Sequence, residues 1–324
     1  MMKISFFEIT EEEKLSLSSA LSEHDCLFFA EKLTNETAHL AKDSEVVSVF
    51  VNSFVSKQTI DLIPNLKFIS TRSTGFDHID TAYAKGKGIV TSNVPSYGSR
   101  TVAEFTFALL LEISRKVSVG NRRLREGLDY SLLGLRGFDL CGKTIGVVGT
   151  GKIGKNVIKI AKGFDMKVLA FDAYPDMNFA KENNFEYVTL NELLSQSDIV
   201  TLHTPYNKDT HHLINSDTLK FFKKGSYIIN TARGELINNS ALLEALNNGI
   251  IAGAGLDVLD GERALKEKKD DTEVLHEDRQ LINMPQVVVT PHVAFSSKEA
   301  EAEILRVTVD NIKSFIANTP KNTV

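Results

Sequence analysis

Residues 145–172, IGVVGTGKIGKNVIKIAKGFDMKVLAFD, carry the pattern of a strand, a glycine turn, a helix and a second strand. The apolar run 145–148 predicts the first strand, and the glycines from Gly149 to Gly154 form a G-x-G-x-x-G turn. Residues 152–162 keep helical spacing, with the apolar side chains on one side, and 168–171 predicts a second buried strand. This stretch therefore predicts one βαβ unit of a parallel sheet.

The three glycines of this turn predict a dinucleotide-binding site. Gly149 allows the tight turn, Gly151 lets the backbone approach a pyrophosphate, and Gly154 lets helix and strand pack closely. The helix N-terminus offers unpaired N–H groups and a positive dipole end to the phosphates. Asp172 lies 172 − 154 = 18 residues past the last glycine, close to the ~20 typical of the carboxylate that binds the ribose 2′-hydroxyl. An acid there would repel a 2′-phosphate, so we predict NAD rather than NADP. The alternative is an ordinary βαβ turn.

Composition narrows the class of protein. A chain of 324 residues suggests about two domains of ~150 residues each. The formal net charge of −5 gives no electrostatic footprint for nucleic acid. No apolar run approaches the ~18 residues of a membrane span, and the N-terminus turns acidic too soon for a signal peptide. The cysteines, Cys26 and Cys141, form no C-x-x-C, so we expect a cytoplasmic protein with no metal, nucleic-acid or membrane partner.

The first ~95 residues alternate between apolar strand-like runs and helical segments, which argues for a parallel sheet covered on both faces. The expected strands are 3–9, 26–29, 46–51, 66–71 and 88–91, and the expected helices are 11–21, 36–41, 57–63 and 79–85. Asn35 and Ser56 are candidate N-caps of two of these helices. This part of the chain predicts a compact α/β domain without a glycine fingerprint of its own.

Beyond Pro95 the pattern predicts one long apolar crossover helix over 101–119 and an irregular basic segment over 120–142. The nucleotide-binding unit then continues with strands 199–202, 227–230, 252–256 and 287–290 and helices 178–183, 191–195 and 241–248. Thr189 and Glu192 form a capping box for the second of these helices, and the charge run 266–271 is expected to be a solvated loop. A final helix over 298–317 is expected to return to the first domain.

The fold class predicted is therefore α/β. A Rossmann-type doubly wound parallel sheet is inserted into a second, flavodoxin-like α/β domain. The boundaries are 1–97 with 296–324 for the substrate domain and 98–295 for the NAD-binding domain.

Four expected strands end in polar residues, where open α/β sheets bind their ligands. These ends are 73–75, 231–234, 257–262 and 290–292. With their flanks, they resemble the D-isomer-specific 2-hydroxyacid dehydrogenase family. The resemblance covers nearly the whole chain, through STGFDHID (73–80), NVPSYGSRTVAE (93–104), GVVGTGKIG (146–154), LHTP (202–205), NTARGELI (230–237), GLDV (255–258) and TPHVAFSS (290–297).

The resemblance assigns catalysis to Arg233, Glu262 and His292. Reduction of a 2-oxo acid needs a proton for the new alkoxide, which a histidine can supply near neutral pH. A carboxylate such as Glu262 would hold the imidazole in one tautomer. A guanidinium such as Arg233 can grip the substrate carboxylate with two hydrogen bonds. Asp260 is the rival of Glu262, because the surrounding VLDGERALK lacks the proline that often follows this acid in relatives.

The resemblance also implies the residues that contact the ligands. Those for the cofactor are Gly149, Gly151, Lys152, Ile153, Gly154, Asp172, Thr204, Pro205, Thr231, Ala232 and Asp257. Those for the substrate are Thr74, Gly75, Tyr97, Arg233 and Phe295, with Thr74 and Gly75 as a second grip on the carboxylate. A structural strand-end carboxylate is the alternative for Asp257, and core packing is the alternative for Tyr97 and Phe295.

The substrate expected from the resemblance is a small apolar 2-oxo acid. The stretch from Glu262 to His292 is long, 292 − 262 = 30 residues, as in D-lactate and D-2-hydroxyisocaproate dehydrogenases. Pyruvate and D-lactate come first, and bulkier 2-oxo acids second. A non-catalytic NAD-sensing scaffold, similar to the corepressors of this family, is a less favoured alternative. The resemblance further implies a homodimer through the NAD-binding domain, with 101–119 involved.

Overall fold

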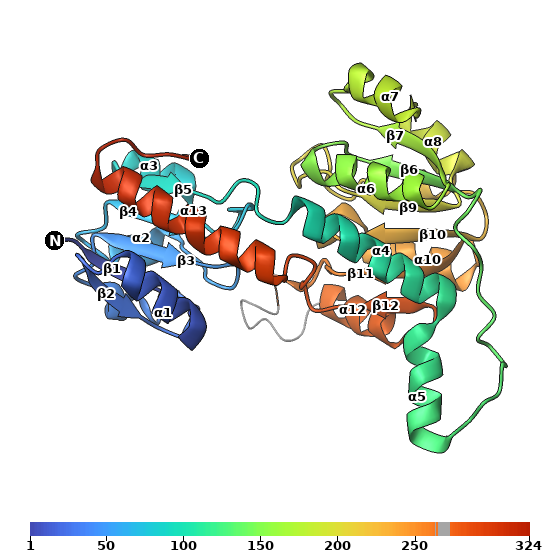
Figure 1. Ribbon diagram of the computed structural model, residues 1–324, viewed down its shortest axis with the longest axis horizontal. Helices are drawn as coiled ribbons and strands as arrows, with labels where there is room; N and C mark the ends of the chain where they lie inside the picture. Colours follow the sequence, from blue (N-terminus) through green and yellow to red (C-terminus); the bar gives the residue numbers. More distant parts are fainter. Residues whose placement is uncertain (263, 265–272) are drawn as a thin grey trace. The chain divides into compact units, whose positions relative to one another are not determined.

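The computed structural model describes residues 1–262, 264 and 273–324, and the charge run 266–271 lies outside this set. The chain divides into two compact units, Met1–Tyr97 with Ser297–Val324 and Gly98–Ser296. Each unit is built on its own parallel sheet (Figure 1). No helix in the described part of the chain has the length and apolar character needed to cross a bilayer.

The first unit has a five-stranded sheet in the order β2-β1-β3-β4-β5. Its strands are β1 (Lys3–Phe6), β2 (Asp25–Phe28), β3 (Val46–Val49), β4 (Phe68–Thr71) and β5 (Val90–Ser92). All neighbouring pairs run parallel. The central strands β3 and β4 are buried throughout, as a sheet covered on both faces requires. The strands predicted from the sequence are all present, with ends shifted by a few residues.

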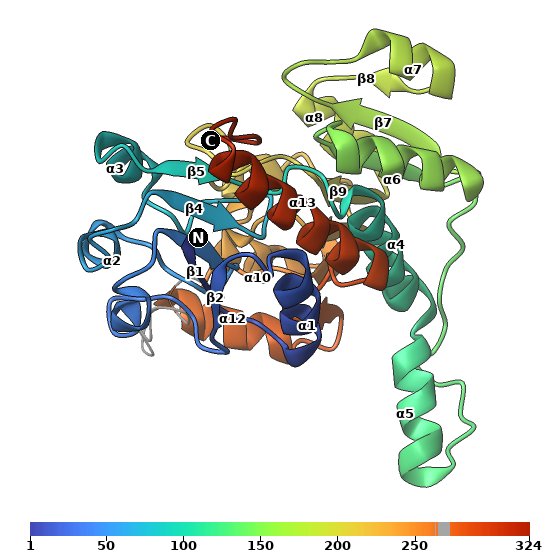
Figure 2. The same cartoon turned by 60° about the vertical axis from the view of Figure 1, so that its left-hand side comes forward.

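Helices cover the two faces of this sheet. One core contains Ala38 from the short 3₁₀ helix η1 (Ala38–Ala41), Ile60 from α2 (Lys57–Asp61) and Ala84 from α3 (Thr81–Gly86). The other contains Leu17 from α1 (Glu11–Ala20) and Ile312 from α13 (Lys298–Ile316). The rings of Phe68 and Phe315 stack with centroids 4.4 Å apart. The C-terminal helix therefore packs on the first sheet, beside α1 (Figure 2).

One of the two N-caps predicted in this unit is wrong. Ser56 caps α2 by accepting a hydrogen bond from the Thr59 N–H, as predicted. Asn35 caps no helix, because the predicted helix 36–41 is only η1, which starts after Thr37. The Asn35 side chain instead accepts from the hydroxyls of Ser56 and Thr59. Asn35 therefore binds the N-terminal turn of α2 and not a helix of its own.

The second unit has a seven-stranded sheet in the order β12-β11-β10-β9-β6-β7-β8. Its strands are β6 (Thr144–Val148), β7 (Lys167–Phe171), β8 (Glu186–Tyr187), β9 (Ile199–Leu202), β10 (Ser226–Asn230), β11 (Ile251–Leu256) and β12 (Val287–Val289). From β6 the chain moves outward to β7 and β8, and then returns to the other side of β6 at β9. This reversal is the topological switch point at which doubly wound sheets bind nucleotides.

Two apolar cores lie on opposite faces of this sheet. One involves α4 (Ser99–Arg115), α6 (Lys152–Gly163) and α7 (Met177–Asn183), and α4 packs directly against α6. The other involves α8 (Leu190–Gln196), α9 (Ser216–Leu219), α10 (Asn239–Asn247) and α12 (Glu273–Asn283). Thr189 and Glu192 form the predicted capping box of α8. The sequence reading missed β8, α9 and α12.

The single helix predicted over 101–119 is two helices. The chain breaks at Lys116, whose φ of 54° lies in the left-handed region, and α5 (Val117–Gly127) follows it. The segment 120–142 is therefore helical at its start rather than irregular throughout. A glycine in a sequence often indicates a left-handed backbone conformation, whereas a lysine does not. The break at Lys116 could therefore not be predicted from the sequence. None of the residues of α5 is buried.

Candidate active site

The second sheet gathers six of the predicted ligand-binding stretches at the carboxyl ends of its strands. Arg233 follows β10, the run from Asp257 to Glu262 follows β11, and His292 follows β12. These three strands are neighbours in the sheet. The glycine turn, Thr204 and Asp172 follow β6, β9 and β7, which are the next strands along. Predicted catalytic and cofactor residues thus share one edge of one sheet.

The glycine turn has the geometry that a dinucleotide requires. Gly149 has a φ of +93°, and a Cβ on it would lie 2.7 Å from the carbonyl carbon of His203. A Cβ on Gly154 would lie 2.0 Å from the Gly149 oxygen, so only glycine lets α6 start so close to β6. A Cβ on Gly151 would meet nothing within 4 Å. The first and third glycines are thus needed for packing, whereas Gly151 faces open space at a helix N-terminus, where a pyrophosphate fits.

Asp172 lies beside this turn at the end of β7. Its Oδ2 accepts hydrogen bonds from the backbone N–H and the hydroxyl of Thr150, at 2.6 and 2.9 Å. Its Oδ1 accepts from the Tyr174 N–H at 2.8 Å. Thr150 is a residue that the sequence reading missed, because the second position of G-x-G-x-x-G carries no rule for its side chain. It ties the carboxylate of Asp172 to the glycine turn.

His292 and Glu262 form the imidazole–carboxylate pair that the family resemblance implies. Nδ1 of His292 lies 2.9 Å from Oε2 of Glu262. Both side chains are partly exposed, at 29% and 26%. Because Nδ1 is engaged, Nε2 is the ring atom that can pass a proton to a ligand. The His292 backbone has a φ of 54°, an uncommon conformation that is often found at functional sites.

Asp257 holds the loop that carries His292. Its carboxylate accepts from the Thr290 hydroxyl at 2.5 Å and from the N–H groups of Val293 and Ala294 at 3.0 and 2.8 Å. Its backbone oxygen accepts from the His292 N–H at 2.9 Å. Burial raises the pKa of this carboxyl, and these donors act in the opposite direction. These bonds show that Asp257 has the structural role given above as the alternative. Its contact with the cofactor stays a prediction.

The segment that carries Arg233 contacts the turn that carries Glu262. A Cβ on the adjacent Gly234 would lie 2.1 Å from the carbonyl carbon of Leu259, so the two segments touch backbone to backbone. The Asn230 side chain fixes the loop by donating to the Arg233 oxygen and accepting from the Ala232 N–H. One guanidinium nitrogen of the half-buried Arg233 donates to the Ala232 oxygen at 2.7 Å.

The remaining predicted residues are placed less tightly. Thr74 is exposed, and its loop is held by bonds from Thr74 Oγ1 to Val94 O and from Ser73 Oγ to Gly75 O. Tyr97 and Phe295 are half-buried, in the first and second unit respectively. Thr231 is buried, with its hydroxyl 3.0 Å from that of Thr106. Lys152 and Pro205 are exposed, while Ile153, Thr204 and Ala232 are half-buried.

His203 is also close to the glycine turn, but its burial distinguishes it from His292. Burial lowers the pKa of His203 to about 3. Its Nε2 lies 2.8 Å from the Thr201 hydroxyl. A ring that stays neutral at physiological pH and is fully buried is a poor general acid. His292, which is partly exposed and paired with Glu262, is the better candidate.

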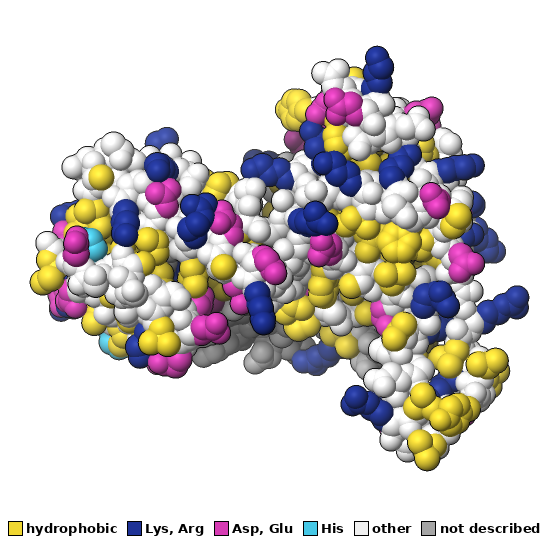
Figure 3. All heavy atoms as spheres, viewed as in Figure 1, with side chains coloured by type: hydrophobic (Ala, Val, Ile, Leu, Met, Phe, Trp, Pro, Cys, Tyr) yellow, Lys and Arg dark blue, Asp and Glu magenta, His cyan; other side chains and the backbone are white. Residues whose placement is uncertain are grey.

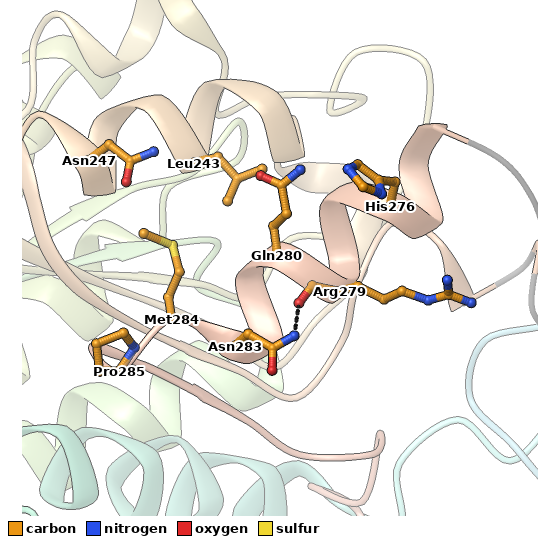
Figure 4. Close-up of a pocket in the computed structure, with 8 residues that line it drawn as sticks. All are labelled: Leu243, Asn247, His276, Arg279, Gln280, Asn283, Met284 and Pro285. Carbon is orange, nitrogen blue, oxygen red and sulfur yellow. Dashed lines mark hydrogen bonds between the residues drawn. The ribbon is translucent and has the colours of Figure 1, made fainter.

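A surface hollow of about 630 Å³ lies elsewhere, between α10 and α12. Leu243, Asn247, His276, Arg279 and Met284 are among its lining residues, and most of them are solvent-exposed (Figure 4). Its one drawn hydrogen bond, from the Asn283 amide to the Arg279 oxygen, is internal to α12. None of the residues predicted for catalysis or cofactor binding lines this hollow. In the described parts of the chain, no three His, Cys, Asp or Glu side chains gather as a metal site would require.

Comparisons with known proteins agree with this geometry. Residues 107–294 match the family described as D-isomer specific 2-hydroxyacid dehydrogenase, NAD binding domain. The D-lactate dehydrogenase of Escherichia coli is 38% identical over 291 residues, covering 89% of this chain and 88% of that protein. An aromatic 2-oxoacid reductase of Clostridium sporogenes is 37% identical over 291 residues, covering 88% and 87%.

A solved structure adds the ligands of a relative. The D-lactate dehydrogenase of Aquifex aeolicus, complexed with NAD and lactic acid, matches with a TM-score of 0.88 and 33% identity over 98% of this chain and 96% of that one. The catalytic motifs, the glycine turn and the similarity over the full length point the same way. The chain therefore belongs to the D-isomer specific 2-hydroxyacid dehydrogenases, oxidoreductases that use NAD.

Proposed function

We propose that this dehydrogenase reduces pyruvate to D-lactate with NADH, reversibly. The observation that carries the proposal is the 2.9 Å contact between His292 Nδ1 and Glu262 Oε2 at the same sheet edge as the glycine turn. A small apolar substrate is supported by the length of the segment between these two residues. It is also supported by the similarity to D-lactate dehydrogenases.

In the proposed reaction the residues of the site have distinct roles. Glu262 holds the His292 ring so that Nε2 carries the proton, and that proton goes to the carbonyl oxygen of the 2-oxo acid. Arg233 grips the substrate carboxylate and polarises the carbonyl. NADH, when bound, supplies the hydride that C2 receives. The glycine turn would bind the pyrophosphate, and Asp172 would bind the adenosine ribose.

A bulkier 2-oxo acid is the second candidate. The chain is as similar to an aromatic 2-oxoacid reductase as to a D-lactate dehydrogenase. A methylene in an apolar pocket changes selection by only ~1–3 kcal/mol. A few side chains can therefore exchange one substrate for the other without altering the catalytic residues.

The test is NADH oxidation measured at 340 nm with pyruvate, 2-oxoisocaproate and phenylpyruvate. We expect the highest kcat/KM with pyruvate. A higher value with phenylpyruvate or 2-oxoisocaproate would replace D-lactate by the bulkier product. Inactivity with all three would leave the NAD-sensing scaffold, which a pull-down with the NADH-loaded protein would then test. Chiral analysis of the product decides between D- and L-lactate.

We further propose that the enzyme is a cytoplasmic homodimer. Two cysteines, both without a disulfide, support a reducing compartment. An apolar patch on α5 and the following loop supports the dimer. It consists of Val117, Leu124, Leu128, Tyr130, Leu132 and Leu133, which are between 38% and 83% exposed. Hydrophobic side chains are visible at the projecting end of α5 and its loop (Figures 1 and 3), and a patch of this kind marks an interaction surface.

A further inference from the structure

The turn Asp260-Gly261-Glu262 carries two imidazole–carboxylate pairs. Glu262 contacts His292, and Asp260 contacts a second histidine, with His212 Nε2 3.1 Å from Asp260 Oδ2. The exposed fractions of His212 and Asp260 are 27% and 13%, so this pair is as sheltered as the catalytic one. The two carboxylates that were rivals in the sequence thus each have their own histidine.

His212 also belongs to the segment that holds Arg233. Its backbone N–H donates to the Glu235 oxygen at 2.8 Å. Two residues further on, Ile214 donates to Leu236 at 3.0 Å and pairs with Ile237 in a parallel bridge. Gly234, next to Arg233, presses on the backbone of Leu259 and Asp260. The His212–Asp260 contact therefore closes a ring that links the Arg233 segment to the Glu262 turn.

Other contacts hold Leu259, Gly261 and Glu262 of this turn, and His212 holds Asp260. The Leu259 N–H donates to Glu262 Oε1 at 3.0 Å. Gly261 lies against Asp278 of α12, where a Cβ would come within 2.1 Å of Oδ2. Asp278 is in turn held by the Asn239 amide at 2.7 Å. The side-chain contact from His212 to Asp260 and the backbone contact of Gly234 with Leu259 both reach the turn from the side of Arg233.

The charged residues around this ring favour the contact between His212 and Asp260. Asp260, Glu262 and Glu235 lie close enough for the first two to raise the pKa of Glu235, although burial is the larger cause. Arg233 acts on Glu235 in the opposite direction. Without His212, the Asp260 carboxylate would face these acids with no imidazole beside it. Repulsion would then move the turn that carries Glu262.

We infer that His212 and Asp260 are positioning residues, which set Glu262 and Arg233 at the separation that catalysis needs. The pair would act through the backbone of 233–237 and 259–262 and would not touch the substrate. This inference rests on the proposed function. It assigns a role to a histidine that the sequence reading passed over, since 48 residues separate it from its partner.

The test is a double-mutant cycle with His212→Phe and Asp260→Ala, assayed with the best 2-oxo acid of the substrate panel. Phenylalanine keeps a flat ring next to His211, whose centroid lies 3.9 Å from that of His212. We expect each single variant to lose about 10-fold to 100-fold in kcat, the scale for reacting groups displaced by a fraction of an ångström to 1 Å. The double variant should be no slower than the slower single one, because one contact is lost in all three.

Three further measurements distinguish positioning from mere stability. NADH affinity, measured by fluorescence titration, should stay within about twofold, because the glycine turn follows β6, two strands away from β10 in the sheet order. The deuterium isotope effect on kcat, measured with NADH labelled at the transferred position, should rise if hydride transfer has slowed. His212→Gln keeps a hydrogen-bond donor and should retain more activity than His212→Phe. His276→Phe, at an exposed position on α12, is the matched control and should behave as wild type.

The possible failures are separable. If the wild-type enzyme reduces no 2-oxo acid, the proposed function fails and the inference falls with it. If the wild type is active but both single variants keep its kcat and isotope effect, the positioning role alone is wrong. Losses that multiply in the double variant, or that follow the melting temperature with an unchanged isotope effect, would also overturn it.

Discussion

His292 is held by constraints from two directions. Glu262 binds its ring, while Asp257 and Thr290 accept its backbone N–H at 2.9 and 3.0 Å and thereby stabilise a φ of 54°. A ring fixed in this way presents Nε2 to the substrate. We expect His292→Ala to lower kcat by about 10²–10⁴, the usual range for a lost acid–base group.

NADH binding to His292→Ala should barely change, because the glycine turn and Asp172 follow other strands. Stopped-flow turnover and fluorescence titration measure the two properties separately. Weak NADH binding with normal turnover of the bound enzyme would show that His292 serves the cofactor instead.

At the residue scale, we propose that Asp172 sets the preference for NADH over NADPH. Both of its oxygens accept hydrogen bonds from Thr150 and Tyr174, so the carboxylate is held in place at the end of β7. We expect Asp172→Ala to lower kcat/KM for NADH and to raise the NADPH-to-NADH ratio by about 10-fold or more, which corresponds to at least ~1.4 kcal/mol. Initial rates with both cofactors measure this ratio. An unchanged ratio would contradict the assignment of Asp172 to the ribose.

At the scale of the elements, the loop after β10 depends on one glycine. A Cβ on Gly234 would come within 2.1 Å of Leu259, so alanine there must push the Glu262 turn away from the Arg233 segment. We expect Gly234→Ala to cost about 1–3 kcal/mol in the free energy of unfolding, as overpacking does, and to lower kcat/KM as well. Gly163→Ala is the matched control, because a Cβ there meets nothing within 4 Å.

Urea unfolding measures the free energy of unfolding of the two glycine variants, and steady-state rates measure their kcat/KM. Equal stability and equal activity would mean that the two segments can separate without cost.

The elements that could be predicted are those whose signal is local. The βαβ unit around Gly149 follows from glycine spacing and apolar periodicity. Ser56 and Thr189 are N-cap residues whose type and position predict the helices that follow them. The break at Lys116 and the His212–Asp260 contact could not be predicted in the same way. The first depends on a left-handed residue that is not glycine, and the second on segments 48 residues apart.

The same limit applies to the candidate site. The motifs named Arg233, Glu262 and His292, and the structure brings the last two within 2.9 Å. The missing proline in VLDGERALK left Asp260 as a rival of Glu262. Only the folded loop separates the two, because it gives each carboxylate a different histidine.

At the scale of the whole molecule, the patch on α5 and its loop predicts the state of assembly. Leu132 and Leu133 are 83% and 82% exposed, and burying a leucine contributes about 1.5–3 kcal/mol. Arg123 and Lys116 hold the loop by donating to the oxygens of Leu133 and Gly134. A fixed apolar surface of this kind suits a second copy of the chain, since closed homodimers are the commonest assemblies.

We expect the enzyme to sediment at twice its chain mass of 35.8 kDa. The double variant Leu132→Asp/Leu133→Asp should sediment as a monomer, because aspartate strongly resists burial at an interface. Leu15→Asp is the matched control, since Leu15 is 74% exposed on α1 of the other unit and should leave the mass unchanged. Equilibrium sedimentation over a range of concentrations separates these outcomes. A wild-type monomer, or a dimer that survives both substitutions in the loop, would require another role for the patch, because the apolar surface would then contribute nothing to self-association.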